Sequence, residues 1–227
     1  RLWVTVARAV PRRGTCTPSS AATGPAIPPL VPHTTRQLHV TAGAVLVDGL
    51  DIRDYGTETL WSAIGLVPQR GYLFTGTIAD NLRYGRSDAT EDDMWTALRV
   101  AAADDFVRAD PDGLQMRVAQ GGINFSGGQR QRLAIARAVI RRPAVYLFDD
   151  AFSALDVRTD ARVRAALREA SADATVIIVS QRISTVAGAD QVIVIDAGRV
   201  VGTGTHSSLL QDCPPYAEFV DSQSVTT

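Results

Sequence analysis

A Ser-Gly-Gly turn that opens an amphipathic helix, followed by an apolar strand that ends in two aspartates, constrains this chain most. Residues 125–138 read Phe-Ser-Gly-Gly-Gln-Arg-Gln-Arg-Leu-Ala-Ile-Ala-Arg-Ala, and residues 145–156 read Val-Tyr-Leu-Phe-Asp-Asp-Ala-Phe-Ser-Ala-Leu-Asp. The first N–H groups of a helix lack internal partners, and the helix dipole leaves partial positive charge there. Glycines let an anion approach the backbone closely. The turn at 126–128 therefore predicts a phosphate site, although a lone Ser-Gly-Gly would more simply be a helix cap.

The second half of this pattern predicts a metal site. Residues 144–148 are a continuous apolar run, as expected of a parallel strand buried on both faces. Asp149 follows at the carboxyl end of that strand, where open α/β sheets bind their ligands. Magnesium takes few carboxylates and keeps several waters, so we expect Asp149 to hold it through water. A solvated acid at a strand end is the alternative for a single aspartate.

Together these motifs resemble the signature motif, Walker B strand and D-loop of ATP-binding cassette (ABC) proteins. The resemblance covers about residues 41–222 and depends on many motifs occurring in the right order. It implies that Asp149 binds Mg²⁺ and that Asp156, in the D-loop, faces an opposite subunit. It also implies that the signature residues contact ATP, namely Ser126, Gly127, Gly128 and Gln129.

A glutamine after an earlier strand fits the same family. Residues 63–68 form a short apolar stretch that ends at Gln69, which matches the Q-loop glutamine linking magnesium, through water, to the membrane domain. Residues 71–84 then resemble the exporter version of the family closely. The assignment of Gln69 depends on spacing alone.

Two positions depart from the family pattern. Asp150 stands where the family usually has a glutamate as general base, and Gln181 stands where it usually has the switch histidine. Aspartate is one methylene shorter, and a misplacement of about 1 Å can cost about a hundredfold in rate. Glutamine can donate a hydrogen bond to phosphate but cannot carry positive charge. Both changes resemble the degenerate subunit of a heterodimeric ABC exporter; independent decay of the two positions is the alternative.

The N-terminal part of the sequence departs further from the family pattern. The sequence contains no lysine, so the phosphate-binding lysine of the P-loop is missing. Residues 8–40 are rich in Pro, Thr, Ser, Ala and Arg without a helical or strand period, which predicts a disordered lead. Shifting the reading frame by one base near residues 23–30 permits a P-loop-like ending, still without lysine. We therefore consider a frameshift alongside true divergence.

Composition bounds the remaining possibilities. A chain of 227 residues with 45% hydrophobic content can bury one substantial core, and a net charge of −1 argues against general nucleic-acid affinity. The two cysteines suggest neither a metal site nor a disulfide framework. No apolar run approaches the eighteen or so residues of a membrane span.

We expect an α/β fold with a P-loop NTPase-like parallel sheet, an inserted helical subdomain carrying the signature, and a disrupted N-terminal part. The predicted domains are a lead lacking the Walker A motif at 1–40, the ABC domain at 41–222, and a tail at 223–227. The helical subdomain should cover about 77–140.

The resemblance implies an ATP-binding subunit of an exporter, using ATP and Mg²⁺, with a degenerate and incomplete site of its own. Its expected partners are a second nucleotide-binding domain in a heterodimer and a transmembrane domain, with no nucleic acid. The transmembrane domain would hold the chain at the cytoplasmic face of the plasma membrane. The alternatives are a soluble ABC-type ATPase and a non-binding relic, and the chain on its own should be inactive.

Overall fold

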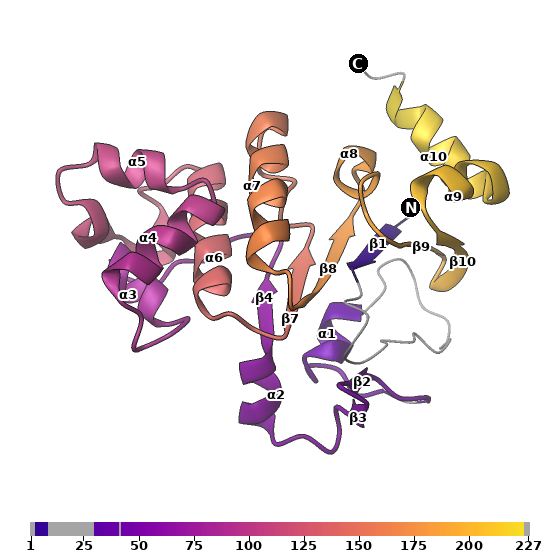
Figure 1. Ribbon diagram of the computed structural model, residues 1–227, viewed down its shortest axis with the longest axis horizontal. Coiled ribbons are helices and arrows are strands. Elements are labelled where there is room, and N and C mark those ends of the chain that lie inside the picture. Colours follow the sequence, from indigo (N-terminus) through magenta and orange to yellow (C-terminus); the bar gives the residue numbers. More distant parts are fainter. Residues whose placement is uncertain (1–2, 9–29, 41, 225–227) are drawn as a thin grey trace. The chain divides into compact units, whose positions relative to one another are not determined.

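The structure is a computed structural model that describes residues 3–8, 30–40 and 42–224 (Figure 1). It divides into two compact units, which are treated separately below. Unit 1 combines residues 1–64 with 174–227, and unit 2 comprises residues 65–173. The fold is mixed α/β, as the sequence predicts.

Unit 2 is mainly helical and contains every predicted site residue except Gln181. Its helices are α3 (Ile78–Arg83), α4 (Glu91–Val100), α5 (Asp104–Ala109), η1 (Gly113–Gln115), η2 (Gln120–Gly122), α6 (Gly127–Ile140) and α7 (Val157–Ala170). Its strands are β4 (Ile64–Val67, whose first residue is grouped with unit 1), β5 (Gly76–Thr77), β6 (Arg117–Val118) and β7 (Val145–Asp149).

Helix α6 forms the centre of unit 2. Ser126 caps its first turn, and nearly the whole second half of the helix is buried, including Leu133, Ile135 and Val139. Burying each such side chain contributes roughly 1.5–3 kcal/mol, which exceeds the helix-propensity differences of up to about 0.7 kcal/mol among ordinary residues. The helix ends at Ile140; Arg142, two residues later, has φ 51°, and Pro143 cannot continue a helix.

Strand β7 follows α6 along the chain and is buried as well. Tyr146, Leu147 and Phe148 are buried, and burial raises the pKa of the Tyr146 hydroxyl to about 12. Strand β4 lies beside β7 in the sheet. A Cβ at Gly65 in β4 would lie 2.7 Å from Cγ of Pro143, so this close approach requires glycine.

Unit 1 contains the remaining strands and short helices. These are β1 (Trp3–Arg8), α1 (Leu30–Thr34), β2 (Leu46–Val47), β3 (Leu50–Asp51), α2 (Thr57–Ala63), β8 (Thr175–Ser180), α8 (Ile183–Val186), β9 (Val192–Asp196), β10 (Arg199–Gly204), α9 (His206–Asp212) and α10 (Pro214–Ser224). Within unit 1 the strand order is β10-β9-β1-β8.

The strands of unit 1 differ from expectation in one respect. The sequence predicts β8 and β9 as successive parallel strands, and both do run in the same direction. They are separated by β1, however, which pairs antiparallel with each of them. Strand β1 therefore has hydrogen-bonded partners on both edges.

A second difference also concerns the lead. Residues 30–34 form helix α1, although residues 8–40 show no helical period. The hydroxyl of Thr35 donates to the carbonyl of Val31 at 2.9 Å and reinforces this single turn. Residues 9–29, where the P-loop-like ending was considered, lie outside the described residues. The domain boundary near residue 41 therefore stays a prediction.

Two tight turns close the hairpins of unit 1. A turn at Asp48-Gly49 joins β2 to β3, with φ of 50° and 79° at its two central residues. The same geometry recurs between β9 and β10, at Ala197 (φ 47°) and Gly198 (φ 77°). Two consecutive positive φ values match the twist of paired strands, and glycine at the second position adopts them without strain.

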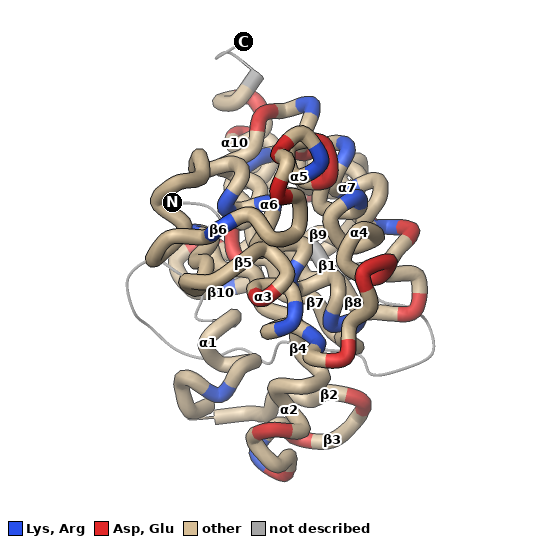
Figure 2. Tube along the Cα trace, turned by 90° about the vertical axis from the view of Figure 1, so that its left-hand side faces the viewer, with Lys and Arg blue, Asp and Glu red and all other residues tan. Residues whose placement is uncertain are grey.

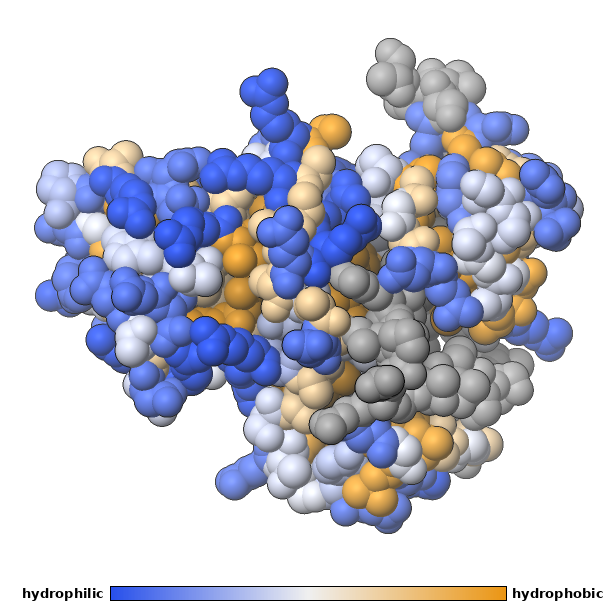
Figure 3. Space-filling model, in the orientation of Figure 1, coloured by the Kyte–Doolittle hydropathy of each residue, from blue (hydrophilic) through white to orange (hydrophobic). Residues whose placement is uncertain are grey.

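Charges of both signs occur along the chain (Figure 2), and much of the face that Figure 3 shows is hydrophilic. In the described part of the chain, no helix combines the length and apolar character needed to cross a bilayer.

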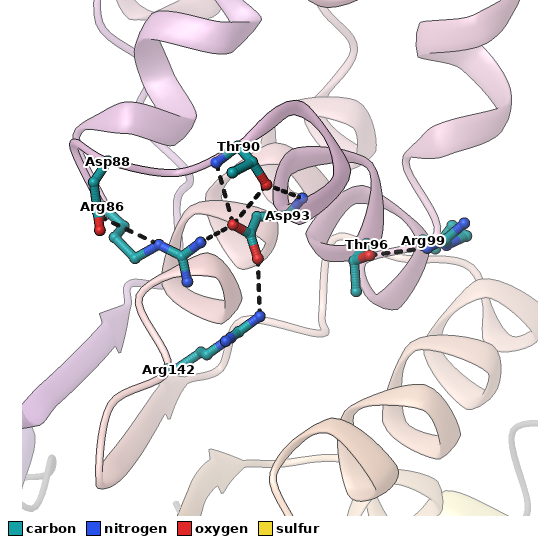
Figure 4. Close-up of polar contacts among 7 residues, drawn as sticks. All are labelled: Arg86, Asp88, Thr90, Asp93, Thr96, Arg99 and Arg142. Carbon is teal, nitrogen blue, oxygen red and sulfur yellow. Dashed lines mark hydrogen bonds and ion pairs between the residues drawn. The ribbon is translucent and has the colours of Figure 1, made fainter.

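A single carboxylate joins three segments of unit 2 (Figure 4). Asp93 and Thr90 form a capping box at the start of α4: the Thr90 side chain accepts from Asp93 N at 3.2 Å, and Thr90 N donates to Asp93 at 3.1 Å. Arg86, after α3, and Arg142, after α6, both pair with the same carboxylate. The hydrogen bonds from Thr90 hold the pKa of Asp93 below its usual value.

We expect Thr90→Ala to lower the free energy of unfolding by about 1 kcal/mol, because the capping bond to the first turn of α4 is lost. Thr96→Ala is the matched control, since the Thr96 hydroxyl only accepts from Arg99 in an exposed mid-helix position. Urea unfolding followed by circular dichroism measures both. Equal stability of the Thr90→Ala and Thr96→Ala variants would show that the cap does not contribute.

Candidate functional site

The signature turn, residues 126–128, is a capped and exposed helix start. The Ser126 hydroxyl accepts from Gln129 N at 3.2 Å, while the Gln129 side chain accepts from Ser126 N at 2.9 Å. Among the described residues, the N–H groups of Gly127 and Gly128 have no recorded acceptor. The cap and the predicted anion site are thus compatible, because the cap uses Gln129 N and leaves the first two helical N–H groups available.

The two glycines differ in surroundings. A Cβ at Gly127 would meet only the end of Arg130, at 4.0 Å, so this glycine faces open space. A Cβ at Gly128 would lie 3.4 Å from the carbonyl oxygen of Ala154, in the predicted D-loop. The signature turn and the D-loop are therefore neighbours within unit 2.

Asp156, the last residue of the D-loop, caps the next helix. Its carboxylate accepts from Thr159 N at 2.9 Å at the start of α7, and this contact holds the pKa of Asp156 below its usual value. The structure thus assigns Asp156 a local role in orienting the D-loop. Its predicted contact with an opposite subunit stays a prediction.

Two carboxylates lie next to each other at the end of β7. Burial, and then the neighbouring charge of Asp150, raise the pKa of Asp149. Asp150 has φ 47°, in the left-handed region, where aspartate and asparagine are enriched among non-glycine residues. The carbonyl of Asp150 accepts from the Ser153 hydroxyl at 2.7 Å, which closes the turn into the D-loop.

The structure brings Gln69 to this strand end. The Gln69 amide nitrogen donates to the Asp150 carboxylate at 2.9 Å, across 81 residues of sequence. The predicted Q-loop glutamine and the residue at the predicted base position therefore meet directly. Their contact occupies one oxygen of Asp150 in this structure.

The residues at this end fit a magnesium ion. Carboxylate and amide oxygens are the hard donors that Mg²⁺ prefers. Desolvation and like charge disfavour an ionised Asp149, and a bound cation would offset both. No cluster of three or more His, Cys, Asp or Glu that could hold a metal occurs among the described residues. Asp149 would hold the ion, and the amide oxygen of Gln69 could face one of its waters.

Gln181 lies in unit 1, directly after β8. Its carbonyl accepts from the side chain of Gln223 in α10, and the same side chain accepts from Ile183 N at 3.0 Å. The loop after β8 is thus held by the C-terminal helix of its own unit. The role of Gln181 as switch residue stays a prediction.

Sequence reasoning missed two polar residues of α6 that hold the Q-loop region. Gln131 is 1% exposed and bonds to the backbone of Pro68 and Gly71. Arg137 donates to the carbonyl of Tyr72 at 2.8 Å. A signal was present for Gln131, because it falls on the buried stripe that continues through Ala134, Ile135 and Ala138. A polar residue on such a stripe requires a partner.

Comparison with known proteins decides the family. Residues 30–153, more than half of the chain, match the ABC transporter family. The chain belongs to this family. The predicted resemblance is confirmed, including its exporter type at the level of fold.

Individual relatives agree with this assignment. An uncharacterized ABC transporter ATP-binding protein of Mycobacterium tuberculosis (strain ATCC 25618 / H37Rv) is 67% identical over 218 residues, covering 95% of this chain and 37% of the relative. A multidrug efflux ATP-binding/permease protein of Mycobacterium bovis (strain BCG / Pasteur 1173P2) is 44% identical over 186 residues, or 82% of this chain and 16% of that protein. The chain therefore spans well under half the length of these relatives.

A solved structure supports the same conclusion about the fold. A bacterial Atm1-family ABC exporter with ATP bound superimposes with a TM-score of 0.82 and 36% identity, covering 86% of this chain and 34% of that chain. The chain is thus an ABC ATP-binding domain that is homologous to those of exporters, and membership of this family implies nucleotide binding.

We expect Asp150→Glu to lower the free energy of unfolding by about 1 kcal/mol, since glutamate tolerates the left-handed conformation less well and shifts the acceptor of Gln69. Asp150→Asn should remain close to the parent, because asparagine adopts this conformation and keeps an oxygen for Gln69. Urea denaturation compares the three proteins. An Asp150→Glu variant as stable as the parent would refute the backbone argument.

Proposed function

We propose that this chain is the ATP-binding domain of an ABC exporter whose own ATP site is degenerate and incomplete. Its signature turn would serve the competent site of a second nucleotide-binding domain in a heterodimer. One contrast carries the proposal. The signature helix begins with the N–H groups of exposed Gly127 and half-buried Gly128, while the base position holds a shortened acid that Gln69 already contacts.

ATP and Mg²⁺ are the ligands that this proposal requires. Ser126, Gly127, Gly128 and Gln129 would contact the γ-phosphate bound mainly by the opposite domain. Charge-assisted hydrogen bonds to phosphate contribute roughly 1.5–3 kcal/mol each, so two or three N–H groups matter. At the chain's own site, Asp149 and Gln69 would hold magnesium. Asp150 and Gln181 would support nucleotide retention better than hydrolysis, because neither supplies the base or the cation of a competent site.

An exposed aromatic surface supports a membrane-domain partner. Tyr72 (49% exposed), Phe74 (39%) and Tyr84 (65%) form what we call the aromatic platform. The Phe74 ring lies 5.4 Å from that of Tyr72 and 4.5 Å from that of Tyr84, measured between centroids. Exposed aromatic clusters mark protein interaction sites, and this one directly follows the Q-loop.

A docked transmembrane domain would place the chain at the cytoplasmic face of the plasma membrane, as a peripheral component. ATP binding and hydrolysis by the pair would then be coupled to movement of the membrane helices. Two alternatives remain distinct: a soluble ABC-type ATPase would not co-purify with a membrane domain, and a non-binding relic would not influence nucleotide turnover by any partner.

The experiment that tests this proposal measures phosphate release from the chain paired with a domain carrying the usual glutamate and histidine. Gly127→Glu should lower turnover by about tenfold or more, because the side chain blocks the phosphate from the helix N–H groups. The new side chain has room within its own chain, so the fold should survive, and gel filtration checks that the pair remains assembled.

Two further variants sharpen this test. Gly56→Glu places the same charge at the exposed start of α2 in unit 1 and should leave turnover unchanged. Asp150→Asn should also change it little, since hydrolysis occurs at the other site. Unchanged turnover in an intact Gly127→Glu pair, or a hundredfold loss from Asp150→Asn, would contradict the degenerate-site proposal.

Nucleotide affinity of the single chain provides an independent test. We expect the isolated chain to bind Mg-ATP weakly and to hydrolyse it negligibly, because it has no lysine for the P-loop position. Isothermal titration with Mg-ATP measures the affinity directly, with Mg-ADP as a comparison. Micromolar affinity would show that the front of the chain provides a phosphate site without lysine.

A further inference from the structure

The Q-loop is attached to the signature helix by one buried side chain. The side-chain oxygen of Gln131 accepts from Gly71 N at 2.7 Å, and its amide nitrogen donates to the carbonyl of Pro68 at 3.0 Å. These two backbone groups lie on either side of Gln69. Gln131 thus uses both halves of its amide to hold the segment that carries the Q-loop glutamine.

The fit between the two segments is close. A Cβ at Gly71 would lie 2.9 Å from the carbonyl oxygen of Arg130 and 3.1 Å from Cα of Gln131. The backbone of Gly71 therefore lies directly against α6, and only glycine fits there. Because Gln131 is 1% exposed, water cannot replace its bonds without opening this contact.

The same helix also holds the aromatic platform. Arg137 donates to the carbonyl of Tyr72 at 2.8 Å, and its guanidinium lies 5.2 Å from the ring centroid of Phe74. Helix α6 begins at the signature turn and runs unbroken to Ile140. One rigid element therefore carries the signature turn and fastens both the Q-loop and the platform.

We propose that Gln131 is a positioning residue that fixes Gln69 to the signature helix. It acts through the backbone of Pro68 and Gly71, and Gln69 in turn contacts Asp150. The Q-loop would then move together with the start of α6 and not independently of it. The assignment of Gln69 and the signature to an ATP site rests on the proposed function, whereas the attachment itself does not.

Hydrogen exchange of the full chain tests the attachment. Gln131→Met keeps the length of the side chain and removes both hydrogen bonds, so the Gly71 amide should exchange about tenfold faster or more. Gln115→Met is the matched control, because Gln115 is exposed in η1. Amides of β7 should stay protected in both variants, which shows that unit 2 remains folded.

A conservative variant provides a rescue. The protonated carboxyl of Gln131→Glu offers one acceptor and one donor, like the amide it replaces, whereas the ionised form has no donor for Pro68. Protection of Gly71, corrected for the intrinsic pH dependence of exchange, should therefore be near that of the parent at low pH and fall as the carboxyl ionises. This variant also decides the question if Gln131→Met fails to fold.

The position of Gln69 needs its own readout. The side-chain amide resonance of Gln69, observed with ¹⁵N-labelled glutamine, should shift in Gln131→Met toward its position in Asp150→Ala, where the acceptor is absent. A Gly71 amide as protected in Gln131→Met as in Gln115→Met, or an unshifted Gln69 resonance, would overturn the proposal. Either outcome leaves the proposed function standing, and a failed phosphate-release test leaves the attachment standing.

Discussion

Burial of helix α6 is the constraint on which the rest of unit 2 depends. Its apolar residues form the core against which the neighbouring elements pack, and burial of each large side chain contributes far more than any surface contact. The same helix fixes polar geometry, because Gln131 and Arg137 reach the loop after β4. Its start, capped by Ser126, remains exposed. One buried element thus sets the positions of the signature turn, the Q-loop and the aromatic platform.

The end of β7 shows how a strained and charged position can be maintained. Asp149 and Asp150 place two carboxylates at adjacent positions, and burial raises the pKa of the first. Asp150 adopts a left-handed backbone conformation, and its side chain receives a hydrogen bond from Gln69. The local geometry therefore favours aspartate for reasons of backbone and contact. Under the proposed function, the same choice shortens the acid at the general-base position, so the local structure and hydrolysis would make opposite demands on this residue.

Much of the fold could be predicted because local signals were strong. The capping residues Thr77, Thr90 and Ser126, the turn at Asp48-Gly49 and the apolar strand before Asp149 each carry their own physical cause within a few residues. The order of the motifs then indicated the family, which the match over residues 30–153 confirmed. Strand β1 and helix α1 could not be predicted, because β1 is stabilised by pairing with strands that lie far away in the sequence, near residues 176–180 and 192–195, and α1 is a single turn.

The sequence by itself determined which chemical groups are available: a Ser-Gly-Gly helix start, two adjacent strand-end acids, and no lysine. The identity of these groups is read directly from the residues, and their place on strands or helices is read from hydrophobic repeats of two and 3.6 residues. Both are local properties of the sequence. Only the tertiary structure decided which of these groups meet. The hydrogen bond between Gln69 and Asp150 joins residues 81 positions apart, and the hydrogen bond between Gly71 and Gln131 joins residues 60 positions apart. Such contacts depend on how α6 packs in the core, and no local pattern encodes the distance between two side chains brought together by packing.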